Sequence, residues 1–264
     1  MLHLEKITED IHRLVLPFKD IYTTVAILNT PEGVVIFDAA SYPDDVDQYI
    51  LPALEQLQIP QSAVRYIVIS HNHGDHAGGL PRFCQQMPHV TVAAGSDACT
   101  ARVPEKSVQV LNEGDLLLGT LQVIRMPGHT VDSLGLLDLR SHTLVCGDSL
   151  QIYGIYGSGK WGRNIHYIPE HLAMCQRLPG YGIQQILTAH DYHPMGHLIQ
   201  GSDQVALCAQ HCVDALKEIA AFVLQHPELD DEKAMALYNA NSGLPTVGAH
   251  IAAACRKAAA EGIL

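Results

Sequence analysis

Hydrophobic residues along the first part of the chain occur in short runs, and each run ends at a small or polar residue. The run 64–69 is representative, because its length and β-branched character are typical of a buried strand. Pro31-Glu32-Gly33 separates two such runs and predicts a hairpin turn. The pattern predicts strands near residues 11–16, 23–29, 33–38, 64–70, 90–93, 108–111, 116–125, 134–138, 143–146 and 185–188.

Helices are predicted between these strands and, without strands, after residue 200. A helix over about 43–58 begins at Pro43 and carries three aspartates near its start, where the helix dipole favours acidic groups. The segments after residue 200 are Ala-rich and amphipathic. The other predicted helices lie near residues 79–87, 169–178, 202–225, 230–240 and 245–261.

Length and composition are those of a single globular core. The chain has 264 residues, of which 47% are hydrophobic, and this is enough to fill one core. No apolar run approaches the ~18 residues of a membrane span, and the N-terminal residues lack the basic and apolar regions of a secretory signal. The seven cysteines are scattered and odd in number, so we expect reduced thiols and a cytoplasmic protein.

Cys208 and Cys212 are four residues apart on the predicted helix 202–225, so their side chains share one face of that helix. This spacing suits a redox pair or a metal-binding pair. It also suits two small apolar side chains in a core, and core packing is the interpretation that the sequence favours.

The balance of charge restricts the class of partner. The chain carries 28 acidic and 16 basic residues, which gives a net charge of −12. Because nucleic-acid backbones require a basic binding surface, this balance argues against a nucleic-acid partner. We therefore expect a small-molecule substrate, and neither a nucleic acid nor a membrane as partner.

The most informative segment is His71-Asn72-His73-Gly74-Asp75-His76, which directly follows the predicted strand 64–70. It places three imidazoles and a carboxylate on a loop at the C-terminal end of a strand, where α/β proteins commonly place their sites. Imidazole and carboxylate together are a ligand set for zinc or a similar first-row metal. Three later apolar runs end in the same way, at His129, Asp148 and His190.

The spacing His-x-His-x-Asp-His resembles the signature of the metallo-β-lactamase superfamily, and the three later residues complete the ligand order of that family. The resemblance covers roughly residues 10–195. It implies an α/β fold, the four-layer αβ/βα metallo-β-lactamase sandwich, with a helical C-terminal portion. We expect residues 1–200 to form the metallo-β-lactamase-like catalytic core and residues 201–264 to form a helical segment that completes the same domain.

The resemblance also implies a binuclear metal centre and its ligands. One metal would be held by His71, His73 and His129, the second by Asp75, His76 and His190, and both by a bridging Asp148. Two Zn²⁺ ions per chain are expected, with iron or manganese as alternatives. Because a hydroxide shared by two such ions attacks carbonyl groups at neutral pH, Asp75 and Asp148 are the expected catalytic residues.

Asp148 bears on the branch of the superfamily, because the most studied antibiotic-hydrolysing members have Cys at this ligand position. The chain is therefore more similar to the glyoxalase II and lactonase branches. The expected activity is zinc-dependent hydrolysis of an ester-like carbonyl, in a lactone or thioester rather than a lactam. Two alternatives stay open: a mononuclear non-haem iron persulfide dioxygenase that uses only His71, His129 and Asp148, and a non-catalytic metal-binding protein.

Three further features are expected to support the metal centre. Asp38 ends the predicted strand 33–38, and the resemblance implies that it orients a ligand imidazole, with a turn or helix-cap role as the alternative. The C-terminal helices would narrow the mouth of the active site, or else cover the sheet or form a homo-oligomer. The Gly-rich segment 151–163 is either an ordinary packed loop or a substrate-binding loop that uses Tyr153, Tyr156, Lys160, Trp161 and Arg163.

Overall fold

The computed structural model describes residues 2–264, and the chain divides into two compact units. Unit 1 comprises Met1–Arg125 and Leu134–Gly147, and unit 2 comprises Met126–Ser133 and Asp148–Leu264. The predicted metal ligands are shared between the units, because the segment 71–76 belongs to unit 1 and the three later ligands belong to unit 2. The predicted division of the chain at residue 200 stays a prediction.

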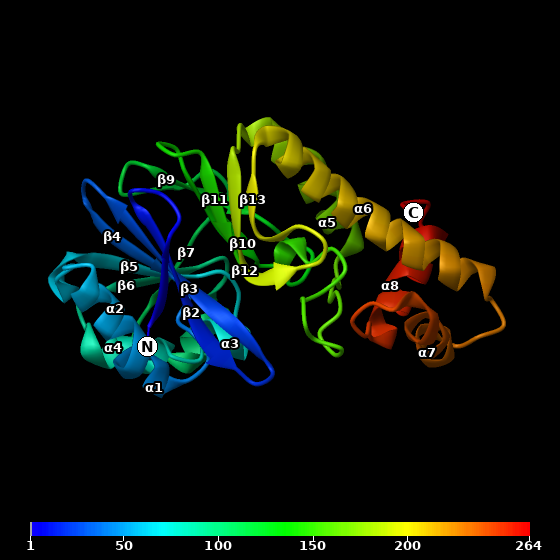
Figure 1. Ribbon diagram of the computed structural model, residues 1–264, viewed down its shortest axis with the longest axis horizontal. Helices are drawn as coiled ribbons and strands as arrows, with labels where there is room; N and C mark the ends of the chain where they lie inside the picture. Colours follow the sequence, from blue (N-terminus) through cyan, green and yellow to red (C-terminus); the bar gives the residue numbers. More distant parts are fainter. Residues whose placement is uncertain (1) are drawn as a thin grey trace. The chain divides into compact units, whose positions relative to one another are not determined.

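Unit 1 contains a seven-stranded sheet with the strand order β1-β2-β3-β4-β5-β6-β7 (Figure 1). Strands β1 to β4 are antiparallel neighbours, whereas β4 to β7 are parallel neighbours. The predicted hairpin is confirmed, since Thr30 pairs with Gly33 across the turn between β3 and β4. The strands are β1 His3–Lys6, β2 Ile11–Phe18, β3 Ile21–Thr30, β4 Gly33–Phe37, β5 Val64–Ile69, β6 Thr91–Ala94 and β7 Val108–Val110.

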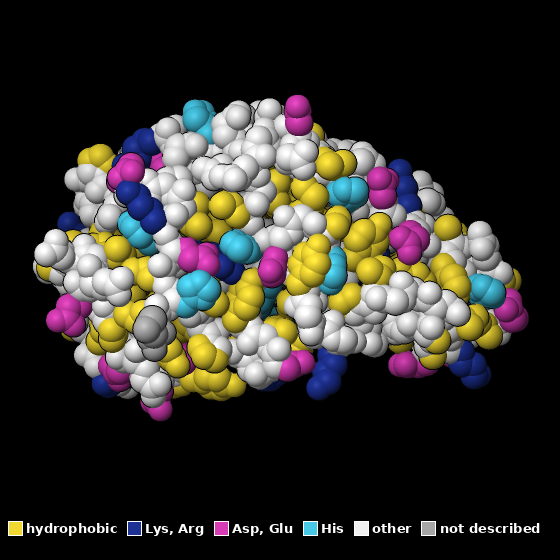
Figure 2. All heavy atoms as spheres, viewed as in Figure 1, with side chains coloured by type: hydrophobic (Ala, Val, Ile, Leu, Met, Phe, Trp, Pro, Cys, Tyr) yellow, Lys and Arg dark blue, Asp and Glu magenta, His cyan; other side chains and the backbone are white. Residues whose placement is uncertain are grey.

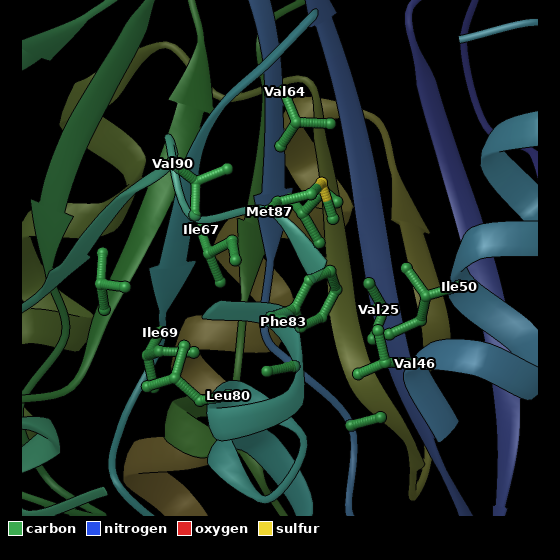
Figure 3. Packing of buried hydrophobic residues seen from close by; sticks show 14 of the residues in the cluster. Val25, Val46, Ile50, Val64, Ile67, Ile69, Leu80, Phe83, Met87 and Val90 are labelled. Carbon is green, nitrogen blue, oxygen red and sulfur yellow. The ribbon is translucent and has the colours of Figure 1, made fainter. Parts of the chain in front are cut away.

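Helices of unit 1 pack against this sheet through apolar side chains that are fully buried. Phe83 and Leu80 of α4 lie beside Ile67 and Ile69 of β5 (Figure 3). The predicted helix over 43–58 is confirmed as three consecutive helical elements, the middle one a π-helix. The helical elements of unit 1 are α1 Pro43–Asp45, η1 Val46–Ile50, α2 Leu51–Gln56, η2 Gln61–Ala63, α3 Gly74–Ala77, α4 Leu80–Gln86 and η3 Asp97–Arg102.

Four more strands of unit 1 are antiparallel neighbours in the order β8-β9-β10-β11. They are β8 Leu116–Leu117, β9 Leu121–Arg125, β10 Leu134–Asp138 and β11 Thr143–Cys146. The prediction of one strand over 116–125 is wrong, because the chain reverses between β8 and β9. Leu117 pairs with Leu121 across a three-residue loop, in which Leu118 and Gly119 both have positive φ, of 45° and 66°.

Unit 2 consists of a β-hairpin and helices that pack on one another. The helix α6 contacts both β12 and β13, which are antiparallel neighbours (Figure 1). The predicted start of the last helix at 245 is wrong: Asn239 bonds both backbone groups of Val247, so α8 begins at Ala249. The elements are η4 Asp148–Leu150, α5 Ile168–Arg177, η5 Leu178–Tyr181, β12 Gln185–Tyr192, β13 Gly196–Gln200, α6 Ser202–Gln225, α7 Asp231–Ser242 and α8 Ala249–Ala260.

None of the helices within residues 2–264 is both long and apolar enough to span a bilayer. On the face shown in Figure 2, basic side chains are interspersed with acidic side chains and apolar surface.

Candidate metal centre

The motif 71–76 begins at the C-terminal end of strand β5 in unit 1, as the sequence predicts. Strand β4 is the parallel neighbour of β5, so the residues that follow these two strands lie at the same edge of the sheet. Asp38 follows β4 and accepts hydrogen bonds from the backbone nitrogen and the hydroxyl of Ser70, at 2.7 and 2.9 Å. The loop that carries the motif is thereby fixed to the end of β4.

Asp38 also contacts a predicted ligand directly. Nδ1 of His76 lies 2.7 Å from Oδ2 of Asp38, and both side chains are buried. A proton on Nδ1 that is donated to the carboxylate leaves Nε2 with a lone pair for a metal. Asp38 has a φ of 67°, which is rare for a residue with a Cβ, and backbone outliers of this kind concentrate at functional sites.

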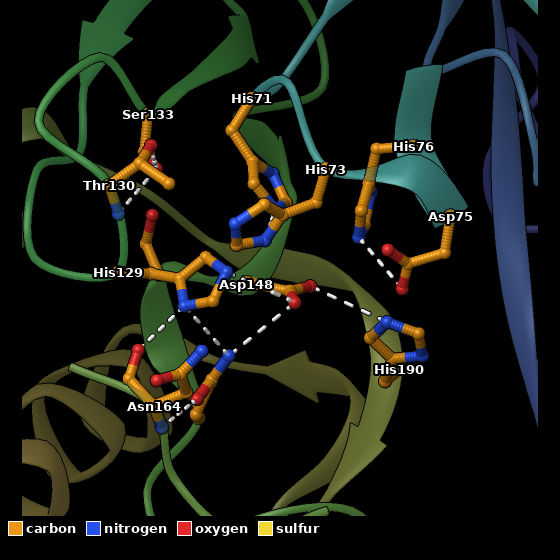
Figure 4. Close-up of polar contacts among 12 residues, drawn as sticks. His71, His73, Asp75, His76, His129, Thr130, Ser133, Asp148, Asn164 and His190 are labelled. Atoms are coloured by element: carbon orange, nitrogen blue, oxygen red, sulfur yellow. Dashed lines mark hydrogen bonds and ion pairs between the residues drawn. The ribbon is translucent and has the colours of Figure 1, made fainter. Parts of the chain in front are cut away.

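His71 is oriented through Ser70. Because the Ser70 hydroxyl donates to Asp38, its oxygen accepts from Nδ1 of His71, which lies 3.0 Å away. The other nitrogen of His71, Nε2, then carries a lone pair that points at His73 (Figure 4). One buried carboxylate therefore sets the ring orientation of two predicted ligands, His76 directly and His71 through a hydroxyl.

The spacing between His71 and His73 fits a shared metal ion. Nε2 of His71 lies 3.1 Å from Nδ1 of His73. Metal–nitrogen bonds of about 2.0–2.1 Å at tetrahedral angles place two nitrogen ligands roughly 3.3 Å apart. Asp75 and His76 form a second pair in the same unit, with Oδ2 of Asp75 3.5 Å from Nε2 of His76 (Figure 4). Unit 1 thus offers two pairs of metal-binding atoms.

Gly78 and Gly79 are required by the close approach of the backbone behind the motif. A Cβ on Gly78 would collide with the carbonyl of Ser41, and one on Gly79 would collide with the carbonyl of Ala39. The backbone nitrogens of the two glycines donate to Ala40 and Ala39. The glycines therefore let α3, which carries Asp75 and His76, lie against the chain that follows β4.

The three predicted ligands of unit 2 also lie together. Oδ2 of Asp148 is 3.7 Å from Nε2 of His129, and its Oδ1 is 3.5 Å from Nε2 of His190 (Figure 4). The carboxylate therefore presents one oxygen to each imidazole. Nδ1 of His129 is 2.6 Å from the carbonyl of Asn164, to which it donates, so its Nε2 carries the lone pair.

Two residues that the sequence analysis did not identify hold Asp148 in place. The hydroxyl of Tyr192 donates to Oδ1 at 2.9 Å, and the amide of Gln151 lies 3.4 Å from Oδ2. Gln151 also accepts from the backbone nitrogen of Asn164, whose carbonyl holds His129. The only sequence signal for Tyr192 is its place two residues after His190 on the same strand, so that both side chains project from one face of β12.

The donor atoms within each unit are of the types found in transition-metal sites. Imidazole nitrogens and carboxylate oxygens are ligands for zinc, iron and manganese. Neighbouring donors in each unit lie within 4.8 Å of one another. Lone pairs held this close repel unless a proton or a cation lies between them. In three of the five histidines, His76, His71 and His129, the second ring nitrogen is bound by a polar group of the chain: Asp38, Ser70 and Asn164 respectively.

The predicted substrate-binding residues of segment 151–163 have different surroundings. Lys160 is exposed, Tyr156 is 40% exposed with its ring against that of His193, and Trp161 is half-buried. Arg163 is buried, donates to the carbonyl of Ala215 and the hydroxyl of Tyr238, and lies over the ring of Tyr153. The expected substrate contact at Arg163 does not fit this position, because its guanidinium is enclosed by helix α6 and α7.

Residues 19–194 match the family model of the metallo-beta-lactamase superfamily. This span is more than half of the chain and includes every predicted metal ligand. The chain belongs to the metallo-β-lactamase superfamily. The resemblance inferred from the motif 71–76 is thereby confirmed.

Some proteins that are similar to this chain in sequence are named for an activity. The hydroxyacylglutathione hydrolase of Vibrio parahaemolyticus serotype O3:K6 is 31% identical over 148 residues, which are 53% of this chain and 53% of the relative. That of Idiomarina loihiensis is 29% identical over 182 residues, or 66% of this chain and 63% of the relative. The uncharacterized protein YobT of Bacillus subtilis is 31% identical over 137 residues, 42% of this chain and 57% of the relative. The matches therefore span between about half and two thirds of the relatives' lengths.

Solved structures of the superfamily share the fold. A metallo-beta-lactamase family protein from Thermus thermophilus superposes with a TM-score of 0.69 at 15% identity, over 97% of this chain and 95% of that one. The DIM-1 metallo-beta-lactamase superposes with a TM-score of 0.62 at 16% identity, over 81% of this chain and 98% of that one. The fold class is the αβ/βα metallo-β-lactamase sandwich with a helical C-terminal portion, as predicted.

Proposed function

We propose that this chain is a binuclear metal-dependent hydrolase, with zinc as its metal, that opens the ester-like carbonyl of a small molecule. The observation that carries the proposal is the position of Asp148, whose two carboxylate oxygens each face Nε2 of a different histidine. A carboxylate held in this way is suited to bridge two cations, because each oxygen can bind one of them.

In the proposed centre, the donors of the two units combine pairwise. The pair His71 and His73 shares one cation with His129, and the pair Asp75 and His76 shares the other with His190. Asp148 binds both cations. Family membership supports this combination, because the matched span 19–194 contains both sets of donors.

The chemistry of the proposed reaction is divided between the cations and the chain. When bound, two such cations lower the pKa of a water that they hold and polarise the carbonyl under attack. The chain fixes the donors: Asp38 and Ser70 set the rings of His76 and His71, and Tyr192 holds the shared carboxylate. No Ser or Cys nucleophile is needed, so hydrolysis would proceed without a covalent acyl-enzyme.

A thioester is the substrate class that we place first, and a lactone second. Relatives from two organisms are named hydroxyacylglutathione hydrolases, and such a name describes thioester cleavage by those proteins. The aspartate at position 148 favours the same branch over lactam hydrolysis. The free thiols of the cysteines support a cytoplasmic location, where such thiols stay reduced.

Isotope labelling tests the reaction class. Purified protein is incubated with a glutathione thioester or an acyl-homoserine lactone in ¹⁸O-water, and the products are analysed by mass spectrometry. We expect one ¹⁸O atom in the product acid, and no acyl-enzyme in the mass spectrum of the intact protein. If the protein hydrolyses none of the carbonyl esters but consumes oxygen when glutathione persulfide is added, the hydrolase proposal is contradicted. That result would indicate the iron dioxygenase.

Lys160 and Trp161 are the residues of segment 151–163 that we propose as substrate contacts. Lys160→Ala should lower kcat/KM by roughly 10- to 150-fold, since a charge-assisted hydrogen bond contributes about 1.5–3 kcal/mol. Trp161→Ala should also lower kcat/KM, because the ring would no longer cover an apolar acyl part of the substrate. Metal content should not change. The exposed Lys217 of α6 provides a matched control, Lys217→Ala, which should leave kcat/KM unchanged. If both loop variants have the wild-type kcat/KM on a good substrate, segment 151–163 does not contact the substrate.

A further inference from the structure

Four buried sulfur and nitrogen side chains meet between two helices of unit 2, and the proposed hydrolase does not use them. His171 and Cys175 are one turn apart on α5, and Cys208 and Cys212 are one turn apart on α6. The two helices are in contact (Figure 1). All four side chains are at most 2% exposed. The sequence therefore places an His-x-x-x-Cys and a Cys-x-x-x-Cys pair on the facing sides of two packed helices.

The contacts within this group converge on Cys212. Cys175, Cys208 and His171 are each close enough to Cys212 to interact with its thiol. Three of the four form the tighter group described next, and Cys208 adjoins it through Cys212. His171, Cys175 and Cys212 each offer one ligand atom, and these atoms lie within 4.8 Å of one another. The sulfur of Cys175 is 3.6 Å from Nε2 of His171. Zinc–sulfur bonds of about 2.3 Å and zinc–nitrogen bonds of about 2.0–2.1 Å at tetrahedral angles give a separation of roughly 3.6 Å.

Packing alone does not account for His171. Three cysteines can fill a core as small apolar side chains, but an imidazole is polar at both nitrogens. Nε2 of His171 meets only sulfur, which is a weak hydrogen-bond partner, and Nδ1 has no hydrogen-bond partner among residues 2–264. Burial of an imidazole with so little compensation is costly. Coordination of a cation by Nε2 would give that nitrogen a strong partner in place of sulfur, with the ring proton on Nδ1.

We propose that His171, Cys175, Cys208 and Cys212 bind one Zn²⁺ ion in a closed structural site that is separate from the proposed hydrolytic centre. One histidine and three cysteines are an established ligand set of structural zinc, and four protein ligands leave no position for a substrate. Thiolate sulfur selects thiophilic cations over magnesium, calcium and manganese. The bound ion would cross-link α5 and α6, which pack together through these residues.

The position of His171 gives the site a second consequence. A Cβ on Gly128 would lie 2.5 Å from Nδ1 of His171, so the backbone at Gly128 rests directly on this ring. Gly128 precedes the predicted ligand His129, and its carbonyl accepts from the backbone nitrogens of His166 and Tyr167 just before α5. A zinc ion that fixes His171 would therefore also fix the support on which the His129 loop lies. His171 acts as a positioning residue in this proposal.

X-ray absorption at the zinc edge tests the site without any substitution. The proposed hydrolytic ligands are histidines and aspartates only, so zinc bound there has nitrogen and oxygen neighbours alone. In protein produced in zinc-supplemented medium and purified under reducing conditions, we expect an additional sulfur shell at about 2.3 Å. A spectrum with nitrogen and oxygen neighbours only, or protein without zinc, would overturn the proposal. A copper ion with sulfur neighbours would overturn the choice of zinc.

Metal content of two variants adds an independent measurement. Cys175→Ser should bind one equivalent of zinc less per chain than the wild type and should lose the sulfur shell. Cys255→Ser is the matched control, because Cys255 is equally buried in unit 2 but lies in the cluster of α6, α7 and α8 side chains around Tyr238. Equal zinc content and equal sulfur shells in wild type and Cys175→Ser would contradict the site, as would a Cys175–Cys212 disulfide in the native protein. If Cys175→Ser does not fold, the wild-type spectrum decides.

Discussion

Asp148→Ala should lose at least one of the two hydrolytic metal ions and nearly all turnover. The carboxylate lies between Nε2 of His129 and Nε2 of His190, and it is the one donor that the proposed centre assigns to both cations. Without it, two cations would repel each other across a single shared water. Because the metal contributes several kcal/mol to stabilisation of the transition state, we expect kcat/KM to fall by roughly 10³-fold or more.

A variant of a buried aspartate that is not a proposed metal ligand shows what destabilisation of the fold alone does to metal binding. Asp138 ends strand β10, is fully buried and pairs with Arg140. Asp138→Ala should reduce the free energy of unfolding but keep both hydrolytic metal ions, as measured by metal analysis of dialysed protein. Full activity and full metal content in Asp148→Ala would show that this carboxylate does not bridge the metals.

Asp38→Asn should lower the affinity of the proposed centre for metal, although Asp38 is not one of the proposed metal ligands. The carboxylate accepts from Nδ1 of His76 and from both donors of Ser70. An asparagine amide that keeps the bond to the Ser70 backbone nitrogen turns its NH₂ toward His76, so Nδ1 becomes the acceptor and Nε2 carries the proton. Nε2 then cannot bind a metal. Loss of such supporting contacts typically lowers metal affinity 10- to 100-fold.

Titration of apo protein with zinc in a competing chelator measures this loss. Asp45→Asn is the matched control: Asp45 is buried, and its Oδ2 accepts from the backbone nitrogens of Ser41 and Tyr42, so an asparagine amide oxygen in that place can retain both bonds. We expect Asp45→Asn to bind zinc with wild-type affinity. If wild type and Asp38→Asn bind zinc with equal affinity, Asp38 does not set the protonation of His76. Its role would then be only to hold Ser70 and the loop that follows β5.

Much of the fold follows from the sequence because each strand carries its own hydrophobic pattern. The run Val64–Ile69 predicts β5, and the Ala-rich pattern predicts α6 at the bounds that the structure shows. The predicted strand 116–125 fails for a local reason, since Gly119 alone does not reveal that Leu118 also takes positive φ. The late start of α8 depends on Asn239, a residue on another helix, and so no local pattern contains it.

The candidate ligands could be predicted because their residue types and spacing form a sequence motif. The residues that hold these ligands in place could not be predicted, because they reach the ligands only through tertiary contacts. Ser70 and Tyr192 have no distinctive pattern, and only the folded chain brings each of them to a carboxylate. Arg163 shows the converse: its place in a glycine-rich segment after Asp148 suggests a substrate contact, but the side chain points into the helices. No local pattern links Cys175 and His171 to Cys212, because they lie on a different helix.

In the proposed hydrolase, the donors of the two units bind two metal ions in one binuclear centre. Anomalous diffraction from crystals of the metal-loaded protein, recorded at the absorption edge of the bound metal, tests it most directly. We expect two peaks about 3.5–4 Å apart. One should be bound by His71, His73 and His129, the other by Asp75, His76 and His190, and both by Asp148. A single peak bound only by His71, His129 and Asp148, or no peak among these residues, would contradict a binuclear centre.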